Sequence, residues 1–128
     1  MSLKSFCVPR SSVLQADRRA TVLSLDTFLK SQVHGPEFFE ENHFTNGMTT
    51  LVDRVFRLLS GSATGSAVFL LSQAMGGGKT HSMIALGLLA KDPELRHRVL
   101  GADDPAPKLG RCRVVGFNGR NTDATGGI

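Results

Sequence analysis

The sequence predicts an α/β fold in which helices cover both faces of a parallel sheet, in three layers. Residues 67–71 form a short apolar run that is typical of a buried strand. Residues 79–91 follow as a segment that is apolar around most of a helix circumference, and residues 111–117 form a second apolar run. A strand, a helix and a second strand in this order make a right-handed unit of a parallel sheet.

A helical segment is expected before the first strand. Apolar residues at helical spacing predict a helix near residues 25–33, and a short helix over 37–41 follows a proline. The clearest amphipathic pattern covers 48–59, where Thr45 or Asn46 can cap the start. The sequence therefore predicts three helices in this half of the chain.

The second half contains one more helix signal. Asp92 stands directly before Pro93, so a capping residue precedes a proline at the first helical position, and Gly101 closes the pattern. We expect a short helix over 93–100, followed by a loop that leads into the second predicted strand.

Length and composition limit the class of protein. The 128 residues suit one domain, and 15 Lys and Arg against 11 Asp and Glu give a net charge of +4, which favours anionic partners mildly. The two cysteines, Cys7 and Cys112, lie far apart in the sequence and predict free thiols in a reducing compartment. With no apolar run near 20 residues and no signal peptide, we expect a cytoplasmic chain without a membrane segment.

Three glycines between the first predicted strand and the helix carry the chemistry. Gly76, Gly77 and Gly78 precede Lys79 and Thr80, the arrangement of a phosphate-binding P-loop, or Walker A motif. Glycines let the backbone curl around a phosphate, and the helix start adds N–H donors and the positive end of its dipole. We expect these amides to bind the β-phosphate of ATP, the Lys79 ammonium to reach the β- and γ-oxygens, and Thr80 to hold Mg²⁺.

Two further residues belong to the same helix start. His81 and Ser82 follow Thr80 and can approach the α-phosphate. Gln73 stands where the full motif has its first glycine, so the pattern departs from the consensus at that position. The alternative is a glycine-rich turn with an incidental Lys-Thr pair.

The motif makes the predicted fold a P-loop NTPase-type three-layer sandwich, here its N-terminal portion. We expect residues 1–62 to form a helical segment that packs on the core, and residues 63–128 to form the strand-helix-strand part of a truncated ATPase domain. The apolar run at 114–117 ends in Asn118, so no acidic Mg²⁺ element follows the loop. The chain alone is expected not to hydrolyse ATP, and to associate with the rest of the domain or with itself.

Several strings of the sequence carry a family resemblance. They are Phe38-Phe39, the stretch 44–48, Leu59-Ser60-Gly61, the stretch 74–82 with its Gly-Gly-Gly-Lys-Thr-His string, 84–86, 114–119 and 125–128. With these strings the chain resembles large prokaryotic P-loop ATPases catalogued as domain of unknown function 499 (DUF499). The resemblance implies an AAA-type ATPase that drives remodelling or translocation, DNA-related or in defence against phage.

The resemblance also points to residues outside the loop. It implies that adenine lies against the segment before the first strand, where Phe44 and Thr45 are candidates; packing beneath the helix 48–59 is the alternative for Phe44. DNA is a further candidate partner, and a set of basic residues could face it. The alternative is that these residues form an ordinary solvated face. They are Arg96, His97, Arg98, Arg111, Arg113 and Arg120. The competing functions are a non-hydrolysing nucleotide-binding or scaffold module and a phosphotransferase.

Overall fold

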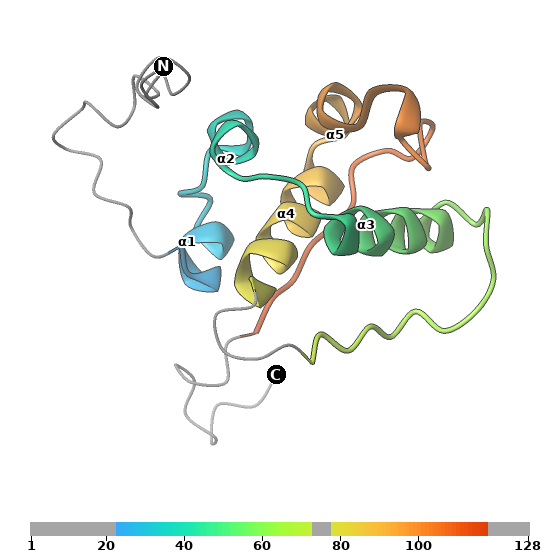
Figure 1. Ribbon diagram of the computed structural model, residues 1–128, viewed down its shortest axis with the longest axis horizontal. Coiled ribbons are helices and arrows are strands. Elements are labelled where there is room, and N and C mark those ends of the chain that lie inside the picture. The colour runs from blue at the N-terminus through green and yellow to red at the C-terminus, as the bar shows by residue number, and fades with distance from the viewer. Residues whose placement is uncertain (1–22, 73–77, 118–128) are drawn as a thin grey trace, which may run out of the picture.

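Helices make up the regular structure of the computed structural model, which describes residues 23–72 and 78–117 (Figure 1). In chain order the elements are α1 (Leu25–Leu29), α2 (Gly35–Glu41), α3 (Asn46–Leu59), α4 (Lys79–Lys91), α5 (Pro93–Leu100) and the 3-10 helix η3 (Gly101–Asp103). Helix α4 lies in the middle and contacts α1, α2 and α5.

Helix α3 begins where its cap residue places it. The Thr45 hydroxyl accepts a hydrogen bond from the backbone N–H of Met48 at 3.3 Å, which satisfies one of the free donors of the first turn. Met48, Val52 and Phe56 recur every four residues and are buried as one stripe. The sequence-based prediction of this helix is confirmed, with two more residues at its start.

Helices α4 and α5 meet at Asp92, which ends one helix and caps the next. Its side chain accepts a hydrogen bond from the N–H of Leu95 at 3.0 Å, and Pro93 fills the first helical position. Gly101 ends α5 with a φ of 56°. The predicted helices 79–91 and 93–100 are both confirmed.

Helix α1 is shorter than the prediction of 25–33. The Ser24 side chain caps it, but Ser31 has a φ of 58°, a left-handed conformation that ends the helix after Leu29. The backbone N–H of Ser31 bonds to the carbonyl of Phe28 at 3.0 Å, which closes the turn. Val33 still packs against the core, from the loop rather than from a helix.

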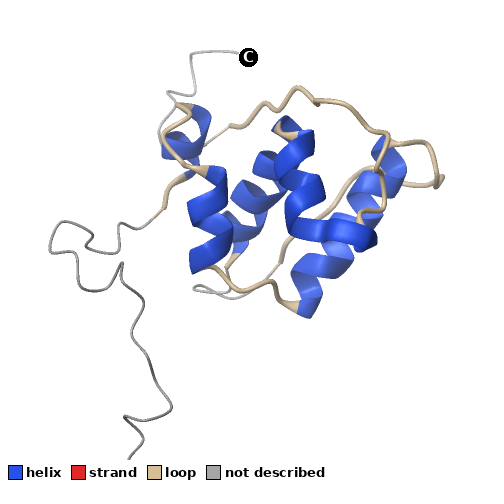
Figure 2. Cartoon of the chain, turned by 90° about the horizontal axis from the view of Figure 1, so that it is seen from above, coloured by secondary structure: helices blue, strands red, loops and turns tan. Residues whose placement is uncertain are grey.

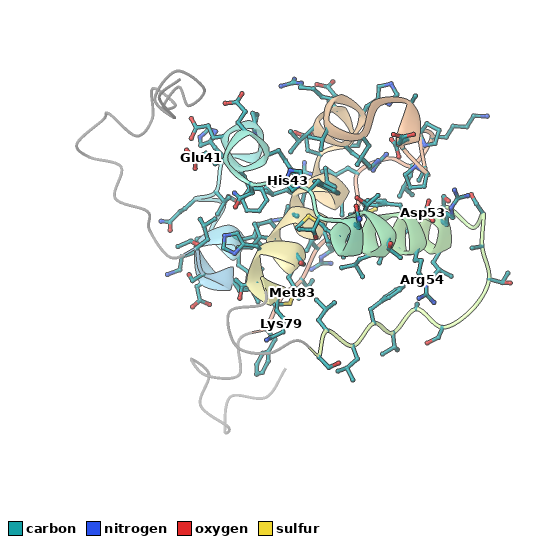
Figure 3. All side chains as sticks on the ribbon, viewed as in Figure 1. Glu41, His43, Asp53, Arg54, Lys79 and Met83 are labelled. Atoms are coloured by element: carbon teal, nitrogen blue, oxygen red, sulfur yellow. The ribbon has the colours of Figure 1, made fainter. Side chains whose placement is uncertain are left out.

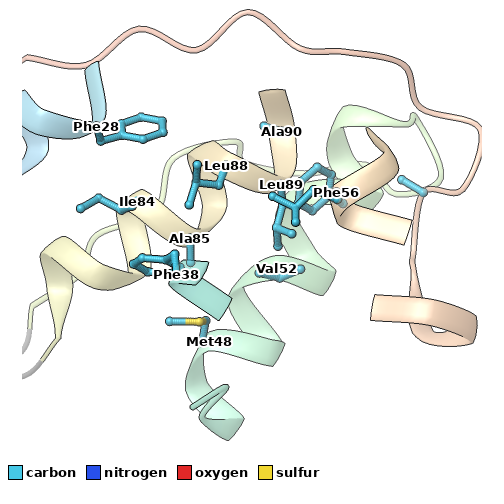
Figure 4. Packing of buried hydrophobic residues seen from close by; sticks show 12 residues of the cluster. Phe28, Phe38, Met48, Val52, Phe56, Ile84, Ala85, Leu88, Leu89 and Ala90 are labelled. Atoms are coloured by element: carbon cyan, nitrogen blue, oxygen red, sulfur yellow. The ribbon is translucent and has the colours of Figure 1, made fainter. Parts of the chain in front are cut away.

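The core lies between the helices, with α4 at its centre (Figure 4). Its buried hydrophobic members come mostly from α1 to α5: Phe28, Phe38, Met48, Val52, Phe56, Ile84, Ala85, Leu88, Leu89, Ala90, Leu95 and Ala106. The close approach of α1 to α4 requires Gly87, because a Cβ there would lie 2.4 Å from Phe28 Cζ. The N-terminal helices and α4 therefore share one core.

The predicted parallel sheet is wrong for the residues that the structure describes. Neither 67–71 nor 111–117 is a strand, and no strand appears in the described part of the chain (Figure 2). The first run is not buried either, since Val68 is 83% exposed and Leu70 is 87% exposed. A strand needs a hydrogen-bonded neighbour, whereas these helices bury their apolar faces against one another. The P-loop NTPase-type three-layer sandwich is therefore not the observed fold.

Both apolar runs are irregular segments, and each has a contact with a helix. Phe69 is half-buried, and the guanidinium carbon of Arg54 on α3 lies over its ring, 5.8 Å from the ring centroid. Exposure alternates along 111–117, and the N–H of Cys112 donates to the carbonyl of Ala90 at 2.8 Å. The alternating exposure along 111–117 thus means that one face of this segment lies on helices and the other points outward. A strand and an extended segment both have this alternation.

The corner after α5 is held by a buried arginine. Arg96 Nε lies 3.2 Å from Asp104 Oδ2, and the same guanidinium donates to the carbonyl oxygens of Ala106 and Leu109. It also lies over the ring of Phe56, 5.1 Å from the centroid. Among the residues described, no helix combines the length and the apolar character that crossing a bilayer requires.

Candidate functional site

The start of helix α4 depends on a glycine. Gly78 is the N-cap residue, and its φ of 75° and ψ of 16° place it in the left-handed region that side chains rarely adopt. A Cβ at Gly78 would meet nothing within 4 Å, so backbone conformation and not crowding requires glycine here. Around the Cβ position of Gly78, the described residues leave open space.

Lys79 and Thr80 occupy the first two positions of α4, and both are half-buried. Figure 3 shows Lys79 at the lower end of the helix. Gly76 and Gly77, the other two glycines of the predicted loop, lie outside the described residues. The structure therefore places the second half of the motif at a helix start, as predicted, and describes nothing of the first half.

The electrostatics of this helix start suit an anion. No side chain caps the helix, and its first turn contains no acidic residue. The first turn of a helix presents backbone N–H groups and the positive end of the dipole, and a carboxylate or a capping oxygen would compete for them. Neither competitor comes from the helix itself.

His81 and Ser82, the predicted neighbours of the α-phosphate, each have a contact within the protein. The imidazole of His81 stacks on the ring of Phe38, with centroids 6.1 Å apart and planes at 30°. The Ser82 hydroxyl donates to the carbonyl of Gly78 at 3.0 Å, inside its own helix. Both side chains therefore have intramolecular contacts.

Phe44 and Thr45 have local roles in the fold. Thr45 caps α3, and its carbonyl also accepts a hydrogen bond from the hydroxyl of Thr49 at 3.2 Å. Phe44 is half-buried, packs against the core, and lies 5.9 Å from Phe39 between ring centroids. Packing accounts for Phe44, which was the alternative to an adenine contact.

Arg96 does not belong to the predicted basic surface. Arg96 is buried in the ion pair with Asp104, so it cannot face DNA. His97, Arg98, Arg111 and Arg113 are exposed, and Arg120 lies outside the described residues. The sequence could not reveal this burial, because Arg96 looks like its exposed neighbours until the position of Asp104 is known.

A cleft of about 890 Å³ was not expected from the sequence. It lies between the α2–α3 connection, α3 and the corner after α5, and residues of α4 do not line it. Its lining includes Phe39, Phe44, Asp53, Arg57 and Asp103, with Asp53 and Arg57 already paired at 2.8 Å. The cleft is therefore separate from the start of α4. In the described ranges, no three His, Cys, Asp or Glu side chains gather in a way that could hold a metal ion.

The fold and the site together define a helical domain whose central helix starts at a left-handed glycine followed by Lys-Thr. The chain belongs to the DUF499 family: the model of the DUF499 N-terminal domain matches residues 28–106, more than half of the chain. The matched range runs from the end of α1 to the corner after α5 and includes the whole predicted loop. Neither a curated protein nor a solved structure matches the chain.

Proposed function

We propose that this chain is the ATP-binding segment of a large prokaryotic ATPase of the AAA type. Gly76, Gly77, Gly78, Lys79 and Thr80 form a Walker A loop that binds the phosphates of ATP together with Mg²⁺. The observation that carries the proposal is the start of α4, where Gly78 is left-handed and Lys-Thr follows without a capping side chain. The parallel sheet of other P-loop enzymes is no part of the proposal.

The residues present fit the triphosphate and the metal in their chemistry. Backbone N–H groups and an ammonium suit phosphate oxygens, and a hydroxyl is a hard oxygen ligand of the kind that Mg²⁺ takes beside phosphates. Bound Mg²⁺ would neutralise charge on the β- and γ-phosphates. Gly78 contributes an open helix start, Lys79 contributes a charge-assisted hydrogen bond, and Thr80 contributes a metal ligand.

The proposed biological role follows the family resemblance. Hydrolysis in the whole ATPase drives remodelling of a partner or movement on DNA, in the cytoplasm and in defence against phage. In the residues that the structure describes, no three His, Cys, Asp or Glu side chains are grouped so that they could hold a metal ion. On this proposal the chain binds ATP, and hydrolysis requires its association with the rest of the ATPase domain or with itself.

A second candidate function is a nucleotide-binding module that never hydrolyses ATP and acts through partner contacts. The observation behind it is that no three His, Cys, Asp or Glu side chains of the described residues are grouped so that they could hold a metal ion. Phosphate release by the longest natural form of the chain separates the two functions, because only an ATPase produces it. Release that Lys79→Ala abolishes supports the ATPase, and ATP binding without release supports the module.

The proposal is tested by calorimetric titration of the chain with ATP and Mg²⁺. Charge-assisted hydrogen bonds contribute about 1.5–3 kcal/mol each, so Lys79→Ala should weaken binding at least about tenfold. Lys108→Ala is the matched control, because it removes the same charge from an exposed loop away from α4. Equal affinity of the wild type and Lys79→Ala would refute the proposal.

A further inference from the structure

The ring of His81 rests on a fixed aromatic surface. His81 is the third residue of α4, directly after Thr80, and its ring is stacked on Phe38 of α2. Phe38 is only 4% exposed and belongs to the core, where Figure 4 shows it beside Ala85 and Met48. The imidazole therefore stacks on a side chain that is buried in the core.

Phe38 is itself held by other rings. Phe39 meets it edge to face, with centroids 5.1 Å apart and planes at 82°. Phe39 in turn lies 5.9 Å from Phe44, in the connection between α2 and α3. Four rings thus run from the first turn of α4 to the start of α3, each supported by the next.

The first turn of α4 needs such support. Helix ends fray, and a side-chain cap that would hold this one is missing, because the N-cap residue is Gly78. The backbone N–H groups of Lys79, Thr80 and His81 are the ones that a helix leaves without an intrahelical partner. A phosphate can use these donors only if the first turn keeps a fixed direction.

We infer that His81 is a positioning residue of the phosphate site and not a phosphate ligand. Its side chain fixes the first turn of α4 against Phe38, while its backbone N–H belongs to the group of donors that faces the anion. This inference rests on the proposed function. It assigns Phe38 and the described residues 78–81, which lie far apart in the sequence, to one site.

The test compares two substitutions of the same residue. His81→Ala removes the ring, and His81→Phe keeps a ring that can stack on Phe38 but has no polar atom. Aromatic pairs are worth about 0.5–1.5 kcal/mol, so we expect His81→Ala to weaken ATP·Mg²⁺ binding about 3- to 10-fold. We expect His81→Phe to bind within about twofold of the wild type. Met83→Ala is the control, since Met83 is an exposed residue of the same helix.

Unfolding by urea is measured on each variant, so that affinity is compared only between folded proteins. Phe38→Leu should reproduce the effect of His81→Ala, and the double variant should bind no more weakly than either single one. If Phe38→Leu does not fold, the comparison of His81→Ala with His81→Phe decides alone. Equal loss in these two variants would show that the imidazole contacts the phosphate, and no loss in His81→Ala would show that the stack is irrelevant to binding.

The outcomes separate this inference from the proposed function. If Lys79→Ala binds ATP as well as the wild type, the site itself is wrong. If Lys79→Ala weakens binding while His81→Phe and His81→Ala behave alike, the site stands and the positioning role falls. If His81→Phe alone recovers binding, both stand.

Discussion

Arg96 and Asp104 form an ion pair that is almost entirely closed to solvent, with their side chains 1% and 2% exposed. Both carboxylate oxygens are used: Oδ2 faces the guanidinium at 3.2 Å, and Oδ1 accepts the N–H of Ala106 at 2.9 Å. The guanidinium adds bonds to the carbonyls of Ala106 and Leu109. This pair therefore ties the corner after α5 to the core.

Removing Arg96 should destabilise the whole domain. Arg96→Ala leaves the Asp104 carboxylate buried without its cation, and breaking a buried pair costs about 3–5 kcal/mol. The measurement is the free energy of unfolding by urea. Arg57→Ala is the control, because its ion pair with Asp53 is half exposed and should cost about 1 kcal/mol or less. Equal losses in the two variants would contradict a structural role for the buried pair.

Two glycines in helices should respond in opposite directions to alanine. At Gly87 a Cβ would lie 2.4 Å from Phe28 Cζ, so Gly87→Ala should push α1 from α4 and cost about 1–3 kcal/mol. At Gly47 a Cβ would meet nothing within 4 Å, so Gly47→Ala should stabilise α3 by about 0.4–1 kcal/mol. Thermal unfolding of both variants checks this. A Gly87→Ala protein as stable as the wild type would show that α1 does not pack as described.

The exposed apolar residues at 68 and 70 should promote self-association. Extended segments with exposed apolar side chains are templates for pairing with another chain, and a charge opposes such pairing. We expect Leu70→Lys to lower light scattering of concentrated protein and to change the free energy of unfolding by less than about 0.5 kcal/mol. Phe56→Leu, a buried change, serves as a contrast that should lower stability instead. Unchanged scattering by Leu70→Lys would indicate that this segment does not drive association.

Substitution of Thr80 should change how strongly ATP binding depends on Mg²⁺. If its hydroxyl holds Mg²⁺, Thr80→Ala should lose about tenfold in ATP affinity with Mg²⁺ present and little with EDTA, whereas Thr80→Ser should keep the metal dependence. Calorimetry in the two buffers gives the comparison. A Thr80→Ala variant with the metal dependence of the wild type would remove Thr80 from the metal site.

Local signals in the sequence predicted the helices well. Thr45 and Asp92 are capping residues whose effect is decided within three positions, and both cap the helices as expected. The sheet was predicted wrongly because a short apolar run is compatible with a strand and with an irregular segment beside helices. Which one forms depends on a hydrogen-bonded neighbour, and a run such as 67–71 does not specify its neighbour.

The candidate site was predicted only in part, because sequence reasoning reaches local features and not contacts between distant residues. The helix start at Lys79 follows from glycines and a flanking apolar pattern, which are local. The stack of His81 on Phe38 and the burial of Arg96 depend on residues brought together only by the fold. Sequence reasoning therefore placed His81 among the phosphate ligands and Arg96 on a basic surface. The ion pair with Asp104 shows that Arg96 is buried, and the stack on Phe38 offers another role for His81.

The central claim is that backbone amides at the start of α4 bind the phosphates of ATP. The most direct measurement is a titration of the isotope-labelled chain with ATP and Mg²⁺, followed by the amide resonances in two-dimensional NMR spectra. The account predicts saturable shifts that are largest at Gly78, Lys79 and Thr80. Shifts confined to the residues around the cleft at Phe44 and Asp103, or no saturable shift at all, would contradict it.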